Sequence, residues 1–225
     1  MKVKLVSYSQ PAGEIDGLEN AQDLIAYAAR VSNPSNQLNT ETSAKLLNYL
    51  AKHKHWSPFE MVSACLEIET TRDIARQILR HRSFSFQEFS QRYADPTKDL
   101  DFVLRDARLQ DPENRQNSVE LNIHDDEEHA KIYLDWNEKQ QSVIEASQDA
   151  YTWAIENGIA KEQARAVLPE GNTVSRMYMN GTLRSWIHYI ELRAANGTQL
   201  EHIAIAREVA KVITEIFPLA EDYIS

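Results

Sequence analysis

Arginine, histidine and serine are concentrated in one short stretch of this chain, RHRSFSFQEFSQRY, which begins at Arg80. Arg80 and Arg82 flank His81, and Ser90 precedes a further arginine, Arg92. A guanidinium group is a planar fork of donors that matches phosphate or carboxylate, and a serine hydroxyl adds another donor. Because the 225-residue chain is acidic overall, with a formal net charge of −10, this local excess of cations indicates a site for a small anionic ligand.

Two further arginines, Arg72 and Arg76, precede Arg80 at intervals of four within a helix that we expect over residues 72–80. Residues four apart share one helix face, where like charges repel. A bound anion, or carboxylates such as Asp73, would relieve the repulsion. For Arg72 and Arg76 the sequence leaves both explanations open, whereas the hydrogen-bonding residues that follow Arg80 favour a nucleotide or another phosphorylated ligand.

The composition limits the kinds of partner and location. The negative charge argues against general nucleic-acid binding, which needs an extended basic surface. No stretch approaches the roughly 18 apolar residues of a membrane span, and the first residues do not read as a signal peptide. Cys65 is the only cysteine, so we expect a cytoplasmic protein without an internal disulfide. His53 and His55 lack further ligands, and neither HExxH nor CxxC occurs, so no metal site is predicted.

Hydrophobic periodicity predicts the elements that must position these residues. Strands are expected at residues 2–8, 62–69 and 173–180, and helices at residues 19–31, 41–52, 72–80, 129–157 and 160–167. A further helical stripe begins at Leu183, and Gly158 is placed to end the long helix. We interpret residues 1–225 as one α+β domain.

Three other features of the chain are interpreted locally. Ser57 with Glu60, and Thr198 with Glu201, have the spacing of capping boxes at helix starts. Residues 95–128 are acidic, lack glycine and show little periodicity, so we expect a long excursion that serves as a flexible lid or surface loop.

The last helix carries an unusually wide apolar surface. One stripe is flanked by a second, which predicts burial against both the core and a neighbouring subunit. The two stripes comprise Ile203, Ala206, Ala210, Ile213 and Phe217, with Val209, Val212 and Ile216 beside them.

The order of residues around Arg80 resembles the signature of the flavin-dependent thymidylate synthases, the ThyX family: Arg-His-Arg, seven residues, then serine. Four other segments resemble segments of that family and occur in order at plausible spacing. They are AARVS at 28–32, HWSPFE at 55–60, ARAVLP at 164–169 and LRSWIHYIELR at 183–193.

The resemblance implies both a reaction and an assembly. Such enzymes convert dUMP to dTMP with methylenetetrahydrofolate as carbon donor, while NADPH reduces a bound FAD that supplies the hydride. The implied fold is an α+β domain with a small, mostly antiparallel sheet flanked by helices, assembled as a homotetramer whose active sites are shared between subunits. Because no GxGxxG follows a strand, NADPH is not expected to use a Rossmann motif.

Carried over by position, the resemblance assigns roles to individual residues. The implied FAD site comprises Ser32, Ser57, Glu60, Arg80, His81, Arg82, Gln87, Glu88, Arg184, His188 and Leu192. The implied dUMP site comprises Gln77, Arg80, Glu88, Ser90, Arg92, Arg165 and Arg193, with Arg165 reaching it from another subunit. His55 would line the flavin and folate pocket, and Arg193 would stabilise negative charge on the pyrimidine.

Two candidate nucleophiles are assigned other roles. Cys65 lies within an expected strand with no activating cation nearby, so we predict a structural thiol. Ser90 has no evident His–Asp arrangement to activate it and is assigned to phosphate or sugar binding.

Four positions depart from the family pattern, namely Met61, Gln87, Gly197 and the 180–184 segment, in which Asn180 or Thr182 would take the usual asparagine's role. These departures leave open a catalytically silent flavin- or nucleotide-binding protein. A nucleic-acid-binding module is the further alternative, which the acidic charge disfavours.

Overall fold

A four-stranded antiparallel sheet lies at the centre of the computed structural model, which describes residues 1–223. The strand order is β1-β2-β6-β3, so the sequence-distant β2 and β6 are neighbours and pair over nine positions, from Ser63↔Thr182 to Thr71↔Val174. The bounds are β1 Lys2–Tyr8, β2 Ser63–Thr71, β3 Phe84–Glu88 and β6 Val174–Thr182.

The two faces of the sheet follow the alternation of the sequence. On the inner face Leu66, Ile68 and Met177 are fully buried. On the outer face carboxylates of β2 pair with cations of its neighbours, as in Lys4–Glu67 at 3.2 Å and the Arg176–Glu69 bridge. The sheet therefore buries one face and solvates the other, as expected for an antiparallel sheet.

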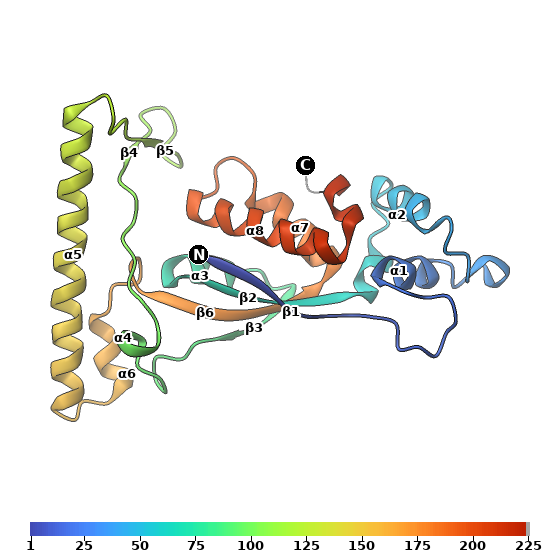
Figure 1. Cartoon of the computed structure of the whole chain (residues 1–225), viewed down its shortest axis with the longest axis horizontal. Coiled ribbons are helices and arrows are strands. Elements are labelled where there is room, and N and C mark those ends of the chain that lie inside the picture. Colours follow the sequence, from blue (N-terminus) through green and yellow to red (C-terminus); the bar gives the residue numbers. More distant parts are fainter. Residues whose placement is uncertain (224–225) are drawn as a thin grey trace.

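Helices surround the sheet unevenly (Figure 1). In that view α7 and α8 lie along one side of the sheet, with α1 and α2 beyond one end and α5 and α6 beyond the other. No helix of residues 1–223 is long and apolar enough to cross a membrane. The helices are α1 Ala21–Ala29, α2 Ser43–Lys52, α3 Arg72–Ile78, α4 Pro96–Asp99, α5 Glu127–Glu156, α6 Lys161–Ala164, α7 Leu183–Arg193 and α8 Leu200–Ile216, with 3-10 turns at Pro34–Asn36 (η1), Ser57–Met61 (η2), Arg165–Val167 (η3) and Pro218–Tyr223 (η4).

The wide apolar surface of α8 packs against the core of its own chain. Val209 and Ile213 are fully buried, while Val212 and Ile216 are partly buried and pack against the same core. That core includes Phe59 and Phe217, whose rings meet edge to face. The width of the apolar surface on α8 therefore gives no support for a subunit contact, because the core of the same chain already covers it.

Both predicted capping boxes are wrong. The N-cap residues are Trp56 for η2 and Gln199 for α8. Neither of them makes a side-chain capping hydrogen bond. Glu201 is instead nearly buried and accepts from Arg108. A carboxylate at the start of a helix is favoured by the helix dipole in any case, so the sequence spacing did not require a capping box.

The 95–128 excursion is more structured than predicted. It contains α4 and a hairpin of β4 (Arg108–Gln110) and β5 (Ser118–Glu120). The hairpin is tied to the body of the protein because Arg108 pairs with Glu201. The long helix was predicted well: Asp126 caps α5, acidic residues follow it, and Gly158 has a φ of +77° just beyond its end.

Substitution of Gly181 tests a close approach between two strands of the sheet. Gly181 of β6 lies opposite Phe84 of β3, and a Cβ there would meet the ring Cδ1 at 2.3 Å. We expect Gly181→Ala to lower the free energy of unfolding by about 1–3 kcal/mol through overpacking, as measured by denaturant unfolding. Gly171→Ala is the matched control, because a Cβ there meets nothing within 4 Å. Equal stability of the two variants would contradict the packing argument.

Candidate functional site

The structure divides the predicted site residues into three groups. We call them the His81 group, the Ser90 cavity and the α7 face. The His81 group contains Gln77, Arg80, His81, Arg82 and Arg193; the Ser90 cavity contains Glu88, Ser90 and Arg165, with Arg92 beside it; the α7 face contains Glu60, Arg184, His188 and Leu192.

In the His81 group, two arginines have no partner among residues 1–223. Arg193 at the end of α7 donates through Nε to His81 Nε2 at 2.8 Å. Burial, together with the positive charges of Arg193 and Arg80, lowers the pKa of His81 to about 4, so the ring is neutral near neutral pH. Arg80 and Arg82 are exposed, and neither has a partner within the described residues. The positive charge of this group therefore resides on its arginines and remains available to an anion.

Gln77 belongs to a partly buried chain of hydrogen bonds. Gln77 Nε2 donates to Gln199 Oε1 at 2.8 Å, and Gln77 Oε1 accepts from His202 Nδ1 at 3.1 Å. Burial lowers the pKa of His202 to about 3, so the ring is neutral and its other nitrogen, Nε2, accepts from the Tyr189 hydroxyl at 3.0 Å. The chain holds the Gln77 amide in one orientation. Each internal donor meets an acceptor, as buried polar groups require.

The Ser90 cavity has a volume of about 610 Å³, and its lining includes both cations and carboxylates. Arg76 grips Glu170 bidentately, with N–O distances of 3.1 and 2.7 Å, and lowers the pKa of that carboxyl. Arg72 lies 3.5 Å from Glu88, which also accepts from the Ser175 hydroxyl at 2.7 Å. Arg72 and Arg76 therefore have carboxylate partners, but these are Glu88 and Glu170 and not the Asp73 that the sequence suggested.

Arg165 lines the same cavity, and no carboxylate of residues 1–223 pairs with it. Its Nε donates to the Glu162 carbonyl at 3.3 Å. Arg92 instead pairs with the Glu162 carboxylate at 3.2 Å, and both side chains are about half exposed. Arg165 and Ser90 thus line one cavity of a single chain, whereas the resemblance implied that Arg165 reaches the dUMP of another subunit.

The α7 face carries residues spaced by four along the helix. Arg184 bridges to Glu60 of η2, and the His188 ring meets Trp56 edge to face at 4.9 Å. Leu192 is 59% exposed although it is apolar. The face thus combines an exposed ion pair, an aromatic edge and an apolar side chain, which suits a large ligand of mixed polarity.

Several residues from the sequence analysis lie outside these groups, among them Ser57, which is exposed at the start of η2. Gln87 pairs with Tyr178 across the strands and is exposed on the outer face of the sheet, unlike Glu88. Cys65 is half-buried on that outer face, and burial raises the pKa of its thiol. Ser32 is exposed, and His55 is exposed beside the rings of Tyr49 and His53. The raised thiol pKa agrees with a structural Cys65.

Sequence reasoning missed Tyr189, Gln199 and His202. His202 interrupts an apolar stripe of α8 and is completely buried, so its position next to buried residues was an available signal. Its partners could not be identified, because they come from α3, α7 and the α7–α8 turn, which the sequence does not connect.

Comparison with known proteins identifies the family. The family described as thymidylate synthase complementing protein matches residues 15–219. The chain is 48% identical over 218 residues to a probable flavin-dependent thymidylate synthase of Paramecium bursaria Chlorella virus 1, covering 97% of this chain and 96% of the relative. It is also 48% identical over 219 residues to a flavin-dependent thymidylate synthase of Synechocystis sp., with the same coverage.

A solved structure shares the fold. The UMP/dUMP methylase PolB from Streptomyces cacaoi, bound with 5-Br dUMP, superposes with a TM-score of 0.76 at 23% identity, over 99% of this chain and 93% of that one. The match of the family model over residues 15–219 therefore places this chain in the thymidylate synthase complementing class. The chain belongs to the flavin-dependent thymidylate synthase family, ThyX.

The pH dependence of stability tests the buried state of His202. Its pKa is about 3 in the folded chain and 6.5 ordinarily, so below about pH 6.5 the unfolded chain binds a proton that the folded chain does not. Stability should fall with decreasing pH, by up to about 1.4 kcal/mol per pH unit for this group. His202→Asn keeps an N–H near Nδ1 but cannot titrate. The unfolding free energy of the wild type should therefore decline relative to the variant between about pH 6 and pH 4; parallel curves would refute the assignment.

Proposed function

We propose that this chain is a flavin-dependent thymidylate synthase that converts dUMP to dTMP, with methylenetetrahydrofolate as carbon donor and NADPH-reduced FAD as hydride source. The observation that carries the proposal is the 48% sequence identity, over 97% of this chain, with relatives that bear this name. The motif residues Arg80, His81, Arg82 and Ser90 support it, since all of them are present in the chain.

The Ser90 cavity is the proposed position of the dUMP phosphate and sugar. Arg165 is a cation at the cavity wall that no carboxylate of residues 1–223 pairs with, and the Ser90 hydroxyl offers a donor. Arg92 reaches the ligand by exchanging its half-exposed bridge to Glu162 for the phosphate, which costs little because an exposed ion pair contributes about 0–1 kcal/mol. Glu88, already held by Arg72 and Ser175, accepts from a sugar hydroxyl.

The His81 group is the proposed position of the pyrimidine. Carbon 5 of uracil is a weak nucleophile, and a positive group facing the ring oxygens favours the negative charge that must develop as carbon 5 attacks. Arg193 meets this need because only its Nε is committed to His81. Gln77, fixed by His202 and Gln199, provides an amide in one orientation.

Arg80 and Arg82, the exposed arginines of the His81 group, are the proposed contacts of FAD. Its diphosphate needs cations, and Arg80 and Arg82 are exposed without partners among residues 1–223. The α7 face adds Arg184, His188 and Leu192 for the apolar and polar parts of the cofactor. FAD, when bound, supplies the hydride; the residues of this chain orient it and balance its charge.

A homotetramer is the proposed assembly, in the cytoplasm. The predicted FAD and dUMP contacts fall in three groups and not in one cavity of the chain, which suits a site completed by a neighbouring subunit. Since Arg165 and Ser90 share one cavity, we place the subunit boundary elsewhere than between these two residues.

Turnover of dUMP tests the proposal and excludes the silent-binder alternative. Purified, FAD-loaded protein should form dTMP from dUMP, NADPH and methylenetetrahydrofolate. Cys65→Ser should retain activity within about tenfold, because the thiol is on the outer face with a raised pKa and a packing change is modest. Flavin binding without any turnover would leave only the binding function. Loss of turnover in a folded, flavin-loaded Cys65→Ser protein would indicate a cysteine mechanism.

Mixed oligomers test whether Arg92 and Arg165 act from one chain. Arg92→Ala and Arg165→Ala should each weaken dUMP binding by about 1.5–3 kcal/mol, the scale of a charge-assisted hydrogen bond. When the two variants are unfolded together and reassembled, activity should stay at the level of the parents. Recovery toward a quarter of wild-type sites, the share expected from random pairing, would show that the arginines come from different subunits. Wild type carried through the same procedure controls for reassembly.

A further inference from the structure

The chain of hydrogen bonds through Gln77 ends on a buried phenol, Tyr189. This residue is 1% exposed, and among residues 1–223 its hydroxyl bonds only to His202 Nε2, at 3.0 Å. Burial raises the pKa of Tyr189, so the hydroxyl keeps its hydrogen. A buried hydroxyl with a single partner must give that hydrogen to the partner, because the hydrogen would otherwise meet no acceptor. Tyr189 therefore donates, and His202 Nε2 accepts.

This donation determines the direction of the bonds that follow. Burial and the positive charge of Arg193 keep His202 neutral, and a neutral imidazole that accepts at one nitrogen carries its proton on the other. His202 Nδ1 must then donate to Gln77 Oε1, at 3.1 Å. The Gln77 nitrogen is left to donate to Gln199 Oε1, at 2.8 Å. The orientation of the Gln77 amide thus follows from the hydroxyl of Tyr189.

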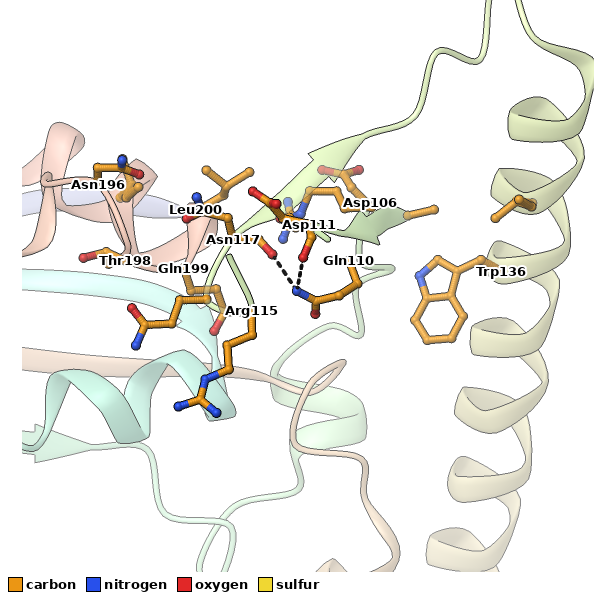
Figure 2. Close-up of a pocket in the computed structure, with 16 residues that line it drawn as sticks. Asp106, Gln110, Asp111, Arg115, Asn117, Trp136, Asn196, Thr198, Gln199 and Leu200 are labelled. Carbon is orange, nitrogen blue, oxygen red and sulfur yellow. Dashed lines mark hydrogen bonds between the residues drawn. The ribbon is translucent and has the colours of Figure 1, made fainter. Parts of the chain in front are cut away.

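The other end of the chain does not select this orientation. Gln199 is partly buried and lines a second cavity, of about 800 Å³, whose walls include the β4–β5 hairpin (Figure 2). In that view Arg115, which has no carboxylate partner among residues 1–223, extends beside Gln199. An amide at an open cavity finds partners in water whichever way it turns. The choice between the two orientations therefore lies with the buried Tyr189 and His202.

These two residues adjoin the proposed pyrimidine site. The His81 ring, which accepts from Arg193, meets the Tyr189 ring edge to face at 4.9 Å and the His202 ring at 6.4 Å. Contacts among the three rings thus connect Arg193 to Gln77. After its two internal bonds the Gln77 amide retains one N–H and one oxygen lone pair for a ligand.

An amide held in one orientation distinguishes uracil from cytosine. Uracil offers an N–H at position 3 beside carbonyl oxygens, whereas cytosine offers a bare ring nitrogen at position 3 beside an amino group. The amide pairs with uracil in one orientation, and with cytosine only after its oxygen and nitrogen exchange places. A glutamine that turns freely would accept both bases, but a glutamine that is held accepts one of them.

We propose that Tyr189 and His202 are specificity-determining positioning residues, which hold Gln77 in the orientation that pairs with uracil and excludes cytosine. The inference rests on the proposed function, because dUMP as the substrate identifies which base the held orientation fits. It deepens that function by assigning the selection of the base to two residues that act through Gln77.

Competition between dUMP and dCMP for the FAD-loaded protein tests the proposal without turnover. The wild type should prefer dUMP. Tyr189→Phe keeps the ring but removes the donor, so His202 can take either tautomer and Gln77 either orientation. The ratio of dUMP affinity to dCMP affinity should then fall at least about tenfold, on the scale of the discrimination that one bidentate pair supplies. A role in packing alone would weaken both nucleotides equally and leave the ratio unchanged.

Tyr151→Phe is the matched control. Tyr151 is also 1% exposed, and its hydroxyl has no hydrogen-bond partner within the described part of the chain, so this substitution should leave the ratio as in the wild type. His202→Leu removes both bonds of the imidazole and should lower the ratio as Tyr189→Phe does. The two substitutions together should lower it no further than His202→Leu alone, because the hydroxyl acts only through His202.

An unchanged ratio in folded, FAD-loaded Tyr189→Phe or His202→Leu protein would overturn the proposal, and so would a wild type that binds dUMP and dCMP equally well. Turnover measured in parallel separates this result from the proposed function. Selective binding of dUMP that depends on Tyr189, in a protein that forms no dTMP, would sustain the proposal and refute the synthase. Formation of dTMP by a protein whose ratio does not depend on Tyr189 would do the reverse.

Discussion

The position of α7 depends on one buried side chain, Trp186. Its indole is fully buried, donates through Nε1 to the Ala64 carbonyl of β2 at 3.1 Å, and packs edge-on against Phe84 of β3. One residue thus joins the helix to two strands of the sheet, with both the apolar body and the polar tip satisfied. Because α7 carries Arg184 and His188 on its exposed side and Tyr189 and Arg193 on others, any rotation of the helix would displace two groups of site residues together.

Charge compensation separates the structural arginines from those that are available to ligands. Arg72, Arg76 and Arg108 each have a carboxylate partner, and such contacts hold α3 and the hairpin in place. Arg80 and Arg115 have none among residues 1–223. Carboxylates are abundant in this acidic protein, yet none of the described ones pairs with these two arginines. Both arginines therefore remain available to ligands. The distinction depends on folding, because all of these arginines look alike in the sequence.

Much of the fold followed from periodicity, and its failures have physical causes. The strands β1, β2 and β6 and the long α5 were predicted because their alternation or stripe is regular. Strand β3 was not predicted, because it has five residues and Phe84 and Phe86 alone supply its apolar alternation. The β4–β5 hairpin is short and largely exposed, so no apolar pattern marks it.

The candidate site, too, could be predicted only in part from the sequence. The motif selected Gln77, His81 and Arg193, but their link through Tyr189 and His202 depends on contacts across three helices, which local patterns do not encode.

The bond from Arg193 to His81 determines which hydrogen-bonding role His81 offers to its surroundings. A neutral imidazole that accepts at Nε2 must carry its proton on Nδ1, so the remaining ring nitrogen of His81 can only donate. Arg80 and Arg82, on either side, are also donors without acceptor capacity. The three consecutive side chains of the motif therefore present a surface that lacks acceptors. A ligand that meets all three must offer oxygen or nitrogen lone pairs at each contact, so this tripeptide selects against ammonium and amino groups by hydrogen-bond polarity as well as by charge.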